Sequence, residues 1–160
     1  MKATRALDIL DRSGITYQLF EHEAGRGEGG YGRTAARALG VDPAIIFKTL
    51  MVSSTSPLVA VIPASGMLSL KKLARVQGVK SLELMDPRKA ENYTGYQLGG
   101  ISPLGLKRAT STVLDASALI HDTIHVSAGR RGWNIALSPH DLIELTGATV
   151  ADIAEEGRHS

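Results

Sequence analysis

The fold is decided by the stretch Ile45-Ile46-Phe47-Lys48-Thr49-Leu50-Met51-Val52, which is apolar except at Lys48 and Thr49. A run of this length and composition predicts a buried strand. Because side chains alternate along a strand, Lys48 would share one face with Ile46 and Leu50. Lysine is rarely buried without a partner, since an unpaired ammonium in an apolar site is costly or gives up its proton. Two interpretations follow: Lys48 extends to water from a strand end, or it belongs to an anion-binding site.

The composition is that of a soluble globular protein. The chain has 160 residues, of which 43% are hydrophobic and 21% charged, and this length predicts a single domain over residues 1–160. The apolar runs are too short to span a bilayer. Charges return early in the N-terminal residues, where a signal peptide would be apolar, so we expect a cytoplasmic protein. Without cysteine the chain has no disulfide, thiol nucleophile or thiolate metal site.

Helix and strand signals alternate irregularly along the chain. The glycine-rich segment 23–33 predicts a loop. Helices are predicted at 4–11, 34–39, 69–76, 86–95 and 138–147, and strands at 16–20, 45–52, 58–63, 79–84, 110–114, 124–127, 133–137 and 150–153. This order predicts an α/β domain in which helices surround a mixed, largely antiparallel β-sheet.

The segment 95–105 is apolar and glycine-rich, and contains Gly99-Gly100-Ile101-Ser102-Pro103. Adjacent glycines let the backbone approach a ligand closely, and free N–H groups in such a turn bind an anion or a developing oxyanion. The alternative is a tight turn followed by a buried proline. The segment lacks the Gly-Lys-Ser/Thr ending of a phosphate-binding P-loop and the spacing of a dinucleotide fingerprint.

A basic turn, Gly129-Arg130-Arg131-Gly132, joins two predicted strands. Ser127 lies at the end of the first strand and Asn134 in the second, so a hydroxyl and an amide are available nearby. No Gly-x-Ser-x-Gly elbow surrounds Ser127, which therefore is not predicted to be a hydrolase nucleophile. A turn-forming role is the alternative.

The histidines do not predict a metal site. His121 and His125 have a spacing that binds metal only on a helix, whereas Thr123, Ile124 and Val126 predict a strand and no third ligand is evident. His22 follows the first predicted strand, where it either lines a pocket or is solvated.

Basic residues occur in small clusters, which either solvate the surface or converge into a patch that follows a phosphate backbone. The clusters considered for contact with a nucleic acid are Lys107 with Arg108 and Arg130 with Arg131. The few aromatic residues argue against a stacking platform for single strands.

Together these segments resemble the YbaK/EbsC family of aminoacyl-tRNA deacylases, which is similar to the editing domain of bacterial prolyl-tRNA synthetases. The resemblance covers almost the whole chain and is strongest to free-standing Cys-tRNA(Pro) deacylases. It rests on four segments in the family's order: Glu21-His22, Phe47-Lys48-Thr49-Leu50, Gly95-Tyr96 with Gly99-Gly100-Ile101-Ser102-Pro103-Leu104-Gly105, and Ser127-x-Gly129-x-Arg131-Gly132.

The resemblance implies a trans-editing reaction that removes a wrongly attached amino acid, cysteine above all, from tRNA(Pro) without metal or cofactor. It implies that the substrate's own thiol attacks the ester carbonyl to form a thiolactone. Lys48 would be the essential residue, and aminoacyl-tRNA and prolyl-tRNA synthetase would be partners. The residues implied in substrate binding are Phe20, His22, Thr49, Gly99, Gly100, Ile101, Ser127 and Asn134.

Two positions depart from the family pattern. Phe20 stands where the family commonly has tyrosine, and Asn134 where it has aspartate. These departures keep an alternative open, a non-catalytic module that binds a tRNA end or an aminoacyl-adenylate beside a synthetase. A third alternative is a small-molecule binding domain without an RNA partner.

Overall fold

The computed structural model describes residues 4–23 and 30–156, in which short strands alternate with helices. The elements are α1 Arg5–Ser13, β1 Gln18–Glu21, α2 Gly30–Leu39, η1 Pro43–Ile45, β2 Phe47–Ser53, β3 Leu58–Pro63, β4 Gly66–Leu68, α3 Leu70–Gln77, β5 Glu83–Leu84, α4 Pro87–Thr94, β6 Ser111–Asp115, η2 Ala116–Ile120, β7 Ile124–Arg130, β8 Trp133–Leu137, α5 Pro139–Thr146, β9 Thr149–Ala151 and β10 Ala154–Glu156. None of the helices in the described ranges is long and apolar enough to span a bilayer.

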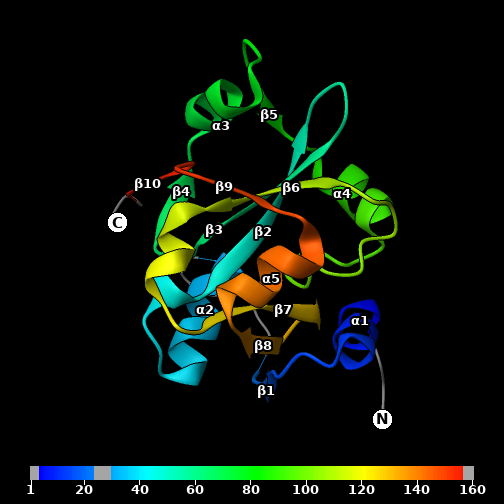
Figure 1. Cartoon of the computed structure of the whole chain (residues 1–160), viewed down its shortest axis with the longest axis vertical. Coiled ribbons are helices and arrows are strands. Elements are labelled where there is room, and N and C mark those ends of the chain that lie inside the picture. The colour runs from blue at the N-terminus through cyan, green and yellow to red at the C-terminus, as the bar shows by residue number, and fades with distance from the viewer. Residues whose placement is uncertain (1–3, 24–29, 157–160) are drawn as a thin grey trace.

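The strands of the described residues form three sheets (Figure 1). The largest has the order β5-β2-β3-β6-β9 and is antiparallel from β5 to β3 and parallel from β3 to β9. The second, β1-β8-β7, and the pair β10-β4 are antiparallel. The predicted α/β class with mixed, largely antiparallel pairing is confirmed, although we expected one sheet.

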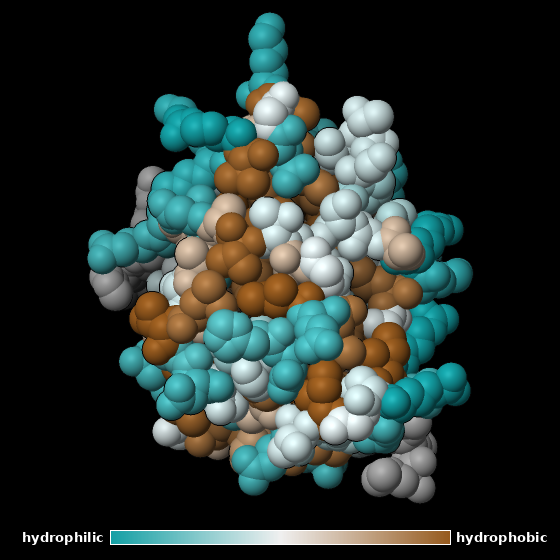
Figure 2. All heavy atoms as spheres, in the orientation of Figure 1, coloured by the Kyte–Doolittle hydropathy of each residue, from teal (hydrophilic) through white to brown (hydrophobic). Residues whose placement is uncertain are grey.

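Both faces of β2 are packed against a core, as its apolar sequence requires. Phe47 and Met51 lie in the core shared with α1 and the β1-β8-β7 sheet, whereas Val52 packs on the other side with Ile62 and Leu73. All six residues of β3 are buried. Figure 2 shows one face of the molecule, where hydrophilic side chains crowd the margins and hydrophobic atoms reach the surface mainly across the middle.

Local end signals agree with the helix predictions. The side chains of the helix-capping residues Thr4, Ser69, Asp86 and Ser138 accept hydrogen bonds from amides of the first turn. The glycines that follow these four helices adopt the left-handed conformation, which requires little strain only for glycine.

Two predictions were wrong in detail, and two short strands were missed. Residues 30–33 were expected in a loop but form the start of α2, while 24–29 of that expected loop lie outside the described residues. The strand expected at 79–84 is reduced to β5. The short strands β4 and β10 were not predicted, because each is defined mainly by its pairing with the other.

Ile46, the residue before β2, meets the β1-β8-β7 sheet in a parallel bridge with His125. On that side β2 is otherwise paired only with β5, through Val52 and Ser53. The intervening part of the β2 edge therefore has no strand partner among the described residues.

Pro63 determines which backbone groups occupy this open edge. Phe47 faces Pro63 in the β2–β3 register, and proline has no N–H to donate. Phe47–Pro63 is therefore a non-hydrogen-bonded pair, and by alternation Thr49–Val61 is another. The N–H and C=O of Thr49 consequently point away from β3, toward the open edge.

The buried carboxylate of Asp115 attaches the C-terminal segment to β6. Its Oδ1 accepts the amides of Ile153 and Ala154 at 2.9 and 3.0 Å, and its Oδ2 accepts the amide and hydroxyl of Ser117. By contrast, Asp152 makes an exposed ion pair with Lys72.

We expect Asp115→Ala to lower the free energy of unfolding by about 3 kcal/mol, because it leaves buried amides without an acceptor. Urea unfolding measures this change. The matched control Asp152→Ala should cost less than about 1 kcal/mol, since exposed ion pairs contribute little. Equal losses in the two variants would contradict this role for Asp115.

Candidate functional site

A cavity of about 470 Å³ opens where β2 and β7 separate beyond the Ile46–His125 bridge. Its walls come from β2, α2, the 98–101 loop, the β7–β8 hairpin and the residue after β1. The predicted site residues that line it are His22, Lys48, Thr49, Gly99, Ile101, Ser127 and Asn134.

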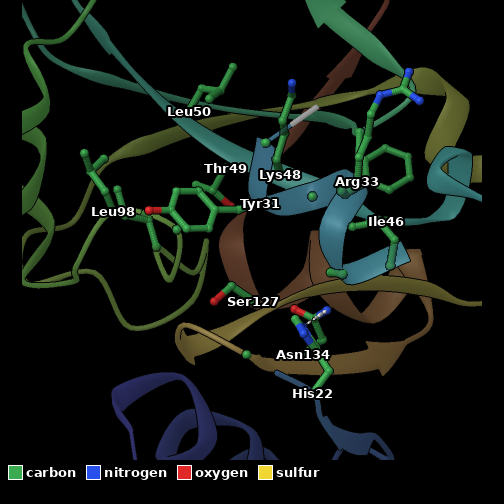
Figure 3. A pocket seen from close by; sticks show the side chains of 18 of the residues that line it. His22, Tyr31, Arg33, Ile46, Lys48, Thr49, Leu50, Leu98, Ser127 and Asn134 are labelled. Atoms are coloured by element: carbon green, nitrogen blue, oxygen red, sulfur yellow. Dashed lines mark hydrogen bonds between the residues drawn. The ribbon is translucent and has the colours of Figure 1, made fainter. Parts of the chain in front are cut away.

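Lys48 lies in the cavity wall, half-buried, and makes no ion pair with any described residue. Burial, with a smaller contribution from the positive charge of Arg33, lowers the pKa of Lys48 below that of free lysine. Figure 3 shows the Lys48 and Arg33 side chains projecting toward the same side of the cavity. Arg33 Nη2 also donates to the carbonyl of Ser65 at 3.3 Å. Two cations therefore share one end of the cavity.

Sheet register assembles the opposite, polar end. Asn134 pairs with Phe20 on one side and with Ser127 on the other, so these three side chains lie on one face of the β1-β8-β7 sheet. Asn134 Nδ2 is 3.4 Å from His22 Nε2, the contact dashed in Figure 3. His22 Nδ1 lies 2.9 Å from the Glu23 carbonyl, which accepts its hydrogen and leaves Nε2 to accept from Asn134.

Hydroxyl groups complete the wall. Ser127 Oγ accepts the Gly129 amide at 3.1 Å, so its own hydrogen remains to be donated. Thr49 Oγ1 is buried and has no hydrogen-bond partner among the described residues. Together with the backbone groups of Thr49 on the open edge, this hydroxyl offers polar atoms to a ligand.

The 97–101 loop is a β-turn in which the Gly100 amide donates to the Gln97 carbonyl at 2.9 Å. Gly99 occupies its third position with φ +81° and Leu98 does not have positive φ, which defines a type II turn. We expected amides throughout this loop to face a substrate, but that of Gly100 is used within the turn. The amides of Gly99 and Ile101 have no acceptor among the described residues.

Two predicted substrate residues do not line the cavity. Gly100 packs behind the loop, where a Cβ would lie 2.8 Å from the Arg131 amide nitrogen. Phe20 lies against the ring of His125, with the ring centroids 5.4 Å apart. Burial lowers the pKa of His125 and favours its neutral form. His125 is part of β7, as the predicted strand required. Among the residues that the structure describes, no group of three or more His, Asp and Glu side chains could hold a metal ion.

The four basic residues predicted to contact tRNA occur in two separate places. Arg108 lies over the Tyr93 ring beside a second hollow of about 350 Å³, and Lys107 is exposed next to it in the sequence. Arg130 and Arg131 are exposed on the β7–β8 hairpin. Their contact with tRNA stays a prediction.

Sequence reasoning missed two residues that shape the cavity, Tyr31 and Arg33. Both lie in the first turn of α2, which we had placed in a loop. The four-residue spacing from Tyr31 to Ala35 is a helical signal that could have extended the predicted helix backwards.

Comparison with protein families identifies the class to which this chain belongs. The aminoacyl-tRNA editing domain family matches residues 33–145, and the chain belongs to this family. This confirms the family inferred from the sequence motifs.

One sequence relative and two solved structures are similar to this chain over nearly its whole length. The chain is 37% identical over 152 residues to the Enterococcus faecalis protein named "Putative Cys-tRNA(Pro)/Cys-tRNA(Cys) deacylase EbsC", covering 94% of this chain and 92% of that protein. A crystal structure of "a putative trans-editing enzyme for prolyl tRNA synthetase" matches with a TM-score of 0.83 and 25% identity, over 94% of this chain and 95% of the other. A structure described as a hypothetical protein matches with a TM-score of 0.85 and 28% identity, over 95% and 100% of the two chains.

The lowered pKa of Lys48 predicts a pH-dependent stability. Between the folded-state pKa and the free-lysine value of 10.5, the unfolded chain binds more protons than the folded one, so the free energy of unfolding should rise with pH across that interval. Urea unfolding over the alkaline range should show a smaller rise for Lys48→Met, and Lys71→Met, which alters an exposed lysine on α3, is the control. The prediction fails if Lys48→Met and the wild type show the same slope.

Proposed function

We propose that this protein is a cytoplasmic aminoacyl-tRNA deacylase that acts in trans and releases cysteine from misacylated tRNA(Pro). The observation that carries the proposal is the cavity itself. It combines two cations with loop amides and hydroxyls, and no carboxylate is found among its described lining residues. Membership of the editing-domain family and the names of the two relatives support the same reading.

The cationic end suits the phosphate of the terminal nucleotide. The lysine ammonium is a compact charge and the arginine guanidinium a planar fork, and both bind phosphate oxygens well. The cavity volume falls within the range of small-ligand pockets, roughly 300–1,000 Å³, which fits an aminoacylated nucleotide rather than a duplex. The rest of the tRNA would remain outside.

The other end of the cavity suits the ester. The amides of Gly99 and Ile101 would donate to the carbonyl oxygen as negative charge develops on it. The cysteinyl thiol loses its proton to solvent, and the sulfur then forms a bond to the carbonyl carbon. The ester C–O bond breaks, the ribose oxygen takes up a proton, and a thiolactone and free tRNA leave. The protein contributes positioning and electrostatic stabilisation.

The contacts of Ser127 and His22 argue against a protein nucleophile. A serine nucleophile needs an adjacent base, yet His22 Nε2 accepts from Asn134 and Ser127 makes no hydrogen bond to a described histidine. The proposal therefore assigns the attack to the substrate's own thiol, as the family resemblance implies.

A second candidate function is a non-catalytic module that binds the tRNA end or an aminoacyl-adenylate beside prolyl-tRNA synthetase. It is favoured by Phe20 and Asn134, because neither supplies a hydroxyl or a charge to the cavity and the Asn134 amide is engaged with His22. Such a module would bind tRNA in a salt-dependent manner without releasing amino acid.

A panel of Cys-, Ala- and Ser-tRNA(Pro) separates these functions. We expect Cys-tRNA(Pro) to be deacylated fastest, because its side chain alone carries a thiol that reaches its own carbonyl. Release of the labelled amino acid over a no-protein control is the measurement. Binding without release would establish the second candidate instead.

Lys48→Ala should reduce deacylation of Cys-tRNA(Pro) by roughly 100-fold or more, comparable with removing one group that stabilises charge in the transition state. Circular dichroism checks that the variant is folded. Lys71→Ala, which alters an exposed lysine that does not line the cavity, should retain wild-type activity. Near-wild-type turnover by Lys48→Ala would overturn the assigned role.

A further inference from the structure

Three hydrogen bonds hold the turn formed by residues 97–100. The Leu98 amide donates to Glu91 Oε2 at 2.9 Å, and the Gly100 amide donates to Gln97. The Leu98 carbonyl accepts a 2.6 Å hydrogen bond from Arg131 Nε. The Glu91 and Gly100 bonds both hold the Gln97–Leu98 peptide unit, whereas the Arg131 bond holds the Leu98–Gly99 unit.

The Arg131 bond acts on the central peptide unit. The Leu98 carbonyl and the Gly99 N–H belong to the same planar peptide group and point in opposite directions. Holding the carbonyl toward Arg131 therefore points the Gly99 amide away from Arg131, and Gly99 is one of the residues that line the cavity.

Type I and type II turns differ mainly in the orientation of this central peptide. A type I turn would keep the hydrogen bond between Gln97 and Gly100. The Leu98–Gly99 peptide would be flipped, however, so the Gly99 N–H would point in the opposite direction. Glycine at the third position tolerates both forms, so Gly99 alone does not select one. The Arg131 hydrogen bond is the contact that favours the type II form.

Tyr31 holds Arg131 in place. The guanidinium carbon lies 5.2 Å from the centre of the Tyr31 ring, a cation–π contact that orients the guanidinium plane. The same ring covers Gly99, since a Cβ there would lie 2.8 Å from three of its carbons. Behind the turn, Gly100 packs directly on the backbone of Arg130 and Arg131.

We propose that Arg131 is a positioning residue that keeps the Leu98–Gly99 peptide oriented with its N–H toward the substrate. This inference rests on the proposed function, and it gives Arg131 a task other than a phosphate contact. Lysine cannot replace it, because an ammonium lacks both the Nε–H of the fork and a plane that stacks on Tyr31.

The kinetic test compares Arg131→Lys and Arg131→Ala with Arg130→Ala on Cys-tRNA(Pro). Arg130 is the matched control, because it lies on the same hairpin with the same charge but stacks over Trp133, 4.6 Å from the ring centre. We expect both Arg131 variants to lose roughly 10- to 100-fold in kcat, as for a small misplacement of a reacting group, with little change in KM or its salt dependence. Arg130→Ala should keep the wild-type kcat, because the predicted contact of Arg130 with tRNA would be lost in KM and its salt dependence, and not in kcat.

A phosphate contact gives the opposite pattern. Arg131→Lys would then retain activity, and the loss in Arg131→Ala would appear in KM and in a shallower salt dependence. Either result would overturn the positioning role.

An amide measurement is independent of catalysis. In 15N-labelled Arg131→Lys, the Gly99 amide signal should shift, broaden or double as the peptide samples both orientations, while Arg130→Ala leaves it unchanged. An unchanged Gly99 signal in Arg131→Lys overturns the proposal even if turnover falls. If the wild type releases no amino acid, the deacylase function fails, and the Gly99 signal still decides the role of Arg131.

Discussion

The site depends on the bridge between Ile46 and His125, where two sheets touch and then separate. If β2 and β7 stayed paired beyond it, the β2 edge would be closed by hydrogen bonds and no cavity would form. Pro63 adds the second constraint. By removing a donor from β3 it sets the pairing phase, so that the Thr49 backbone faces the opening while that of Lys48 is paired with β3.

The cavity carries charge and unpaired polar atoms that the fold itself does not require. Lys48 is desolvated near Arg33, and the Thr49 hydroxyl is buried without a described partner. Both features oppose folding, because buried polar groups normally need hydrogen bonds. Violations of this kind gather at functional sites, where a ligand supplies the missing partners. The capped helices and the fully buried strand β3 contribute the stability that offsets the cost of these unpaired groups.

Much of the fold follows from local signals, whereas the site follows only in part. Lys48 stands out in an apolar run, and the end signals of most helices are explicit. The first turn of α2 is not, because Gly30 and Gly32 are poor helix formers. In that turn Gly32 lies directly against Ala64, since a Cβ at Gly32 would be 2.8 Å from the Ala64 Cβ, and no local pattern reveals this contact. The hydrogen bond from Arg131 to Leu98 likewise joins residues 33 positions apart. Local sequence patterns do not predict a contact at that separation.

The residues that line the cavity are spread along the sequence from His22 to Asn134. Non-local contacts of this kind form late in folding, because the loops between them must close first. A chain still emerging from the ribosome therefore lacks the pocket until β8 has been synthesised and docked. A chain that binds a ligand in this pocket has therefore already brought β1, β7 and β8 together.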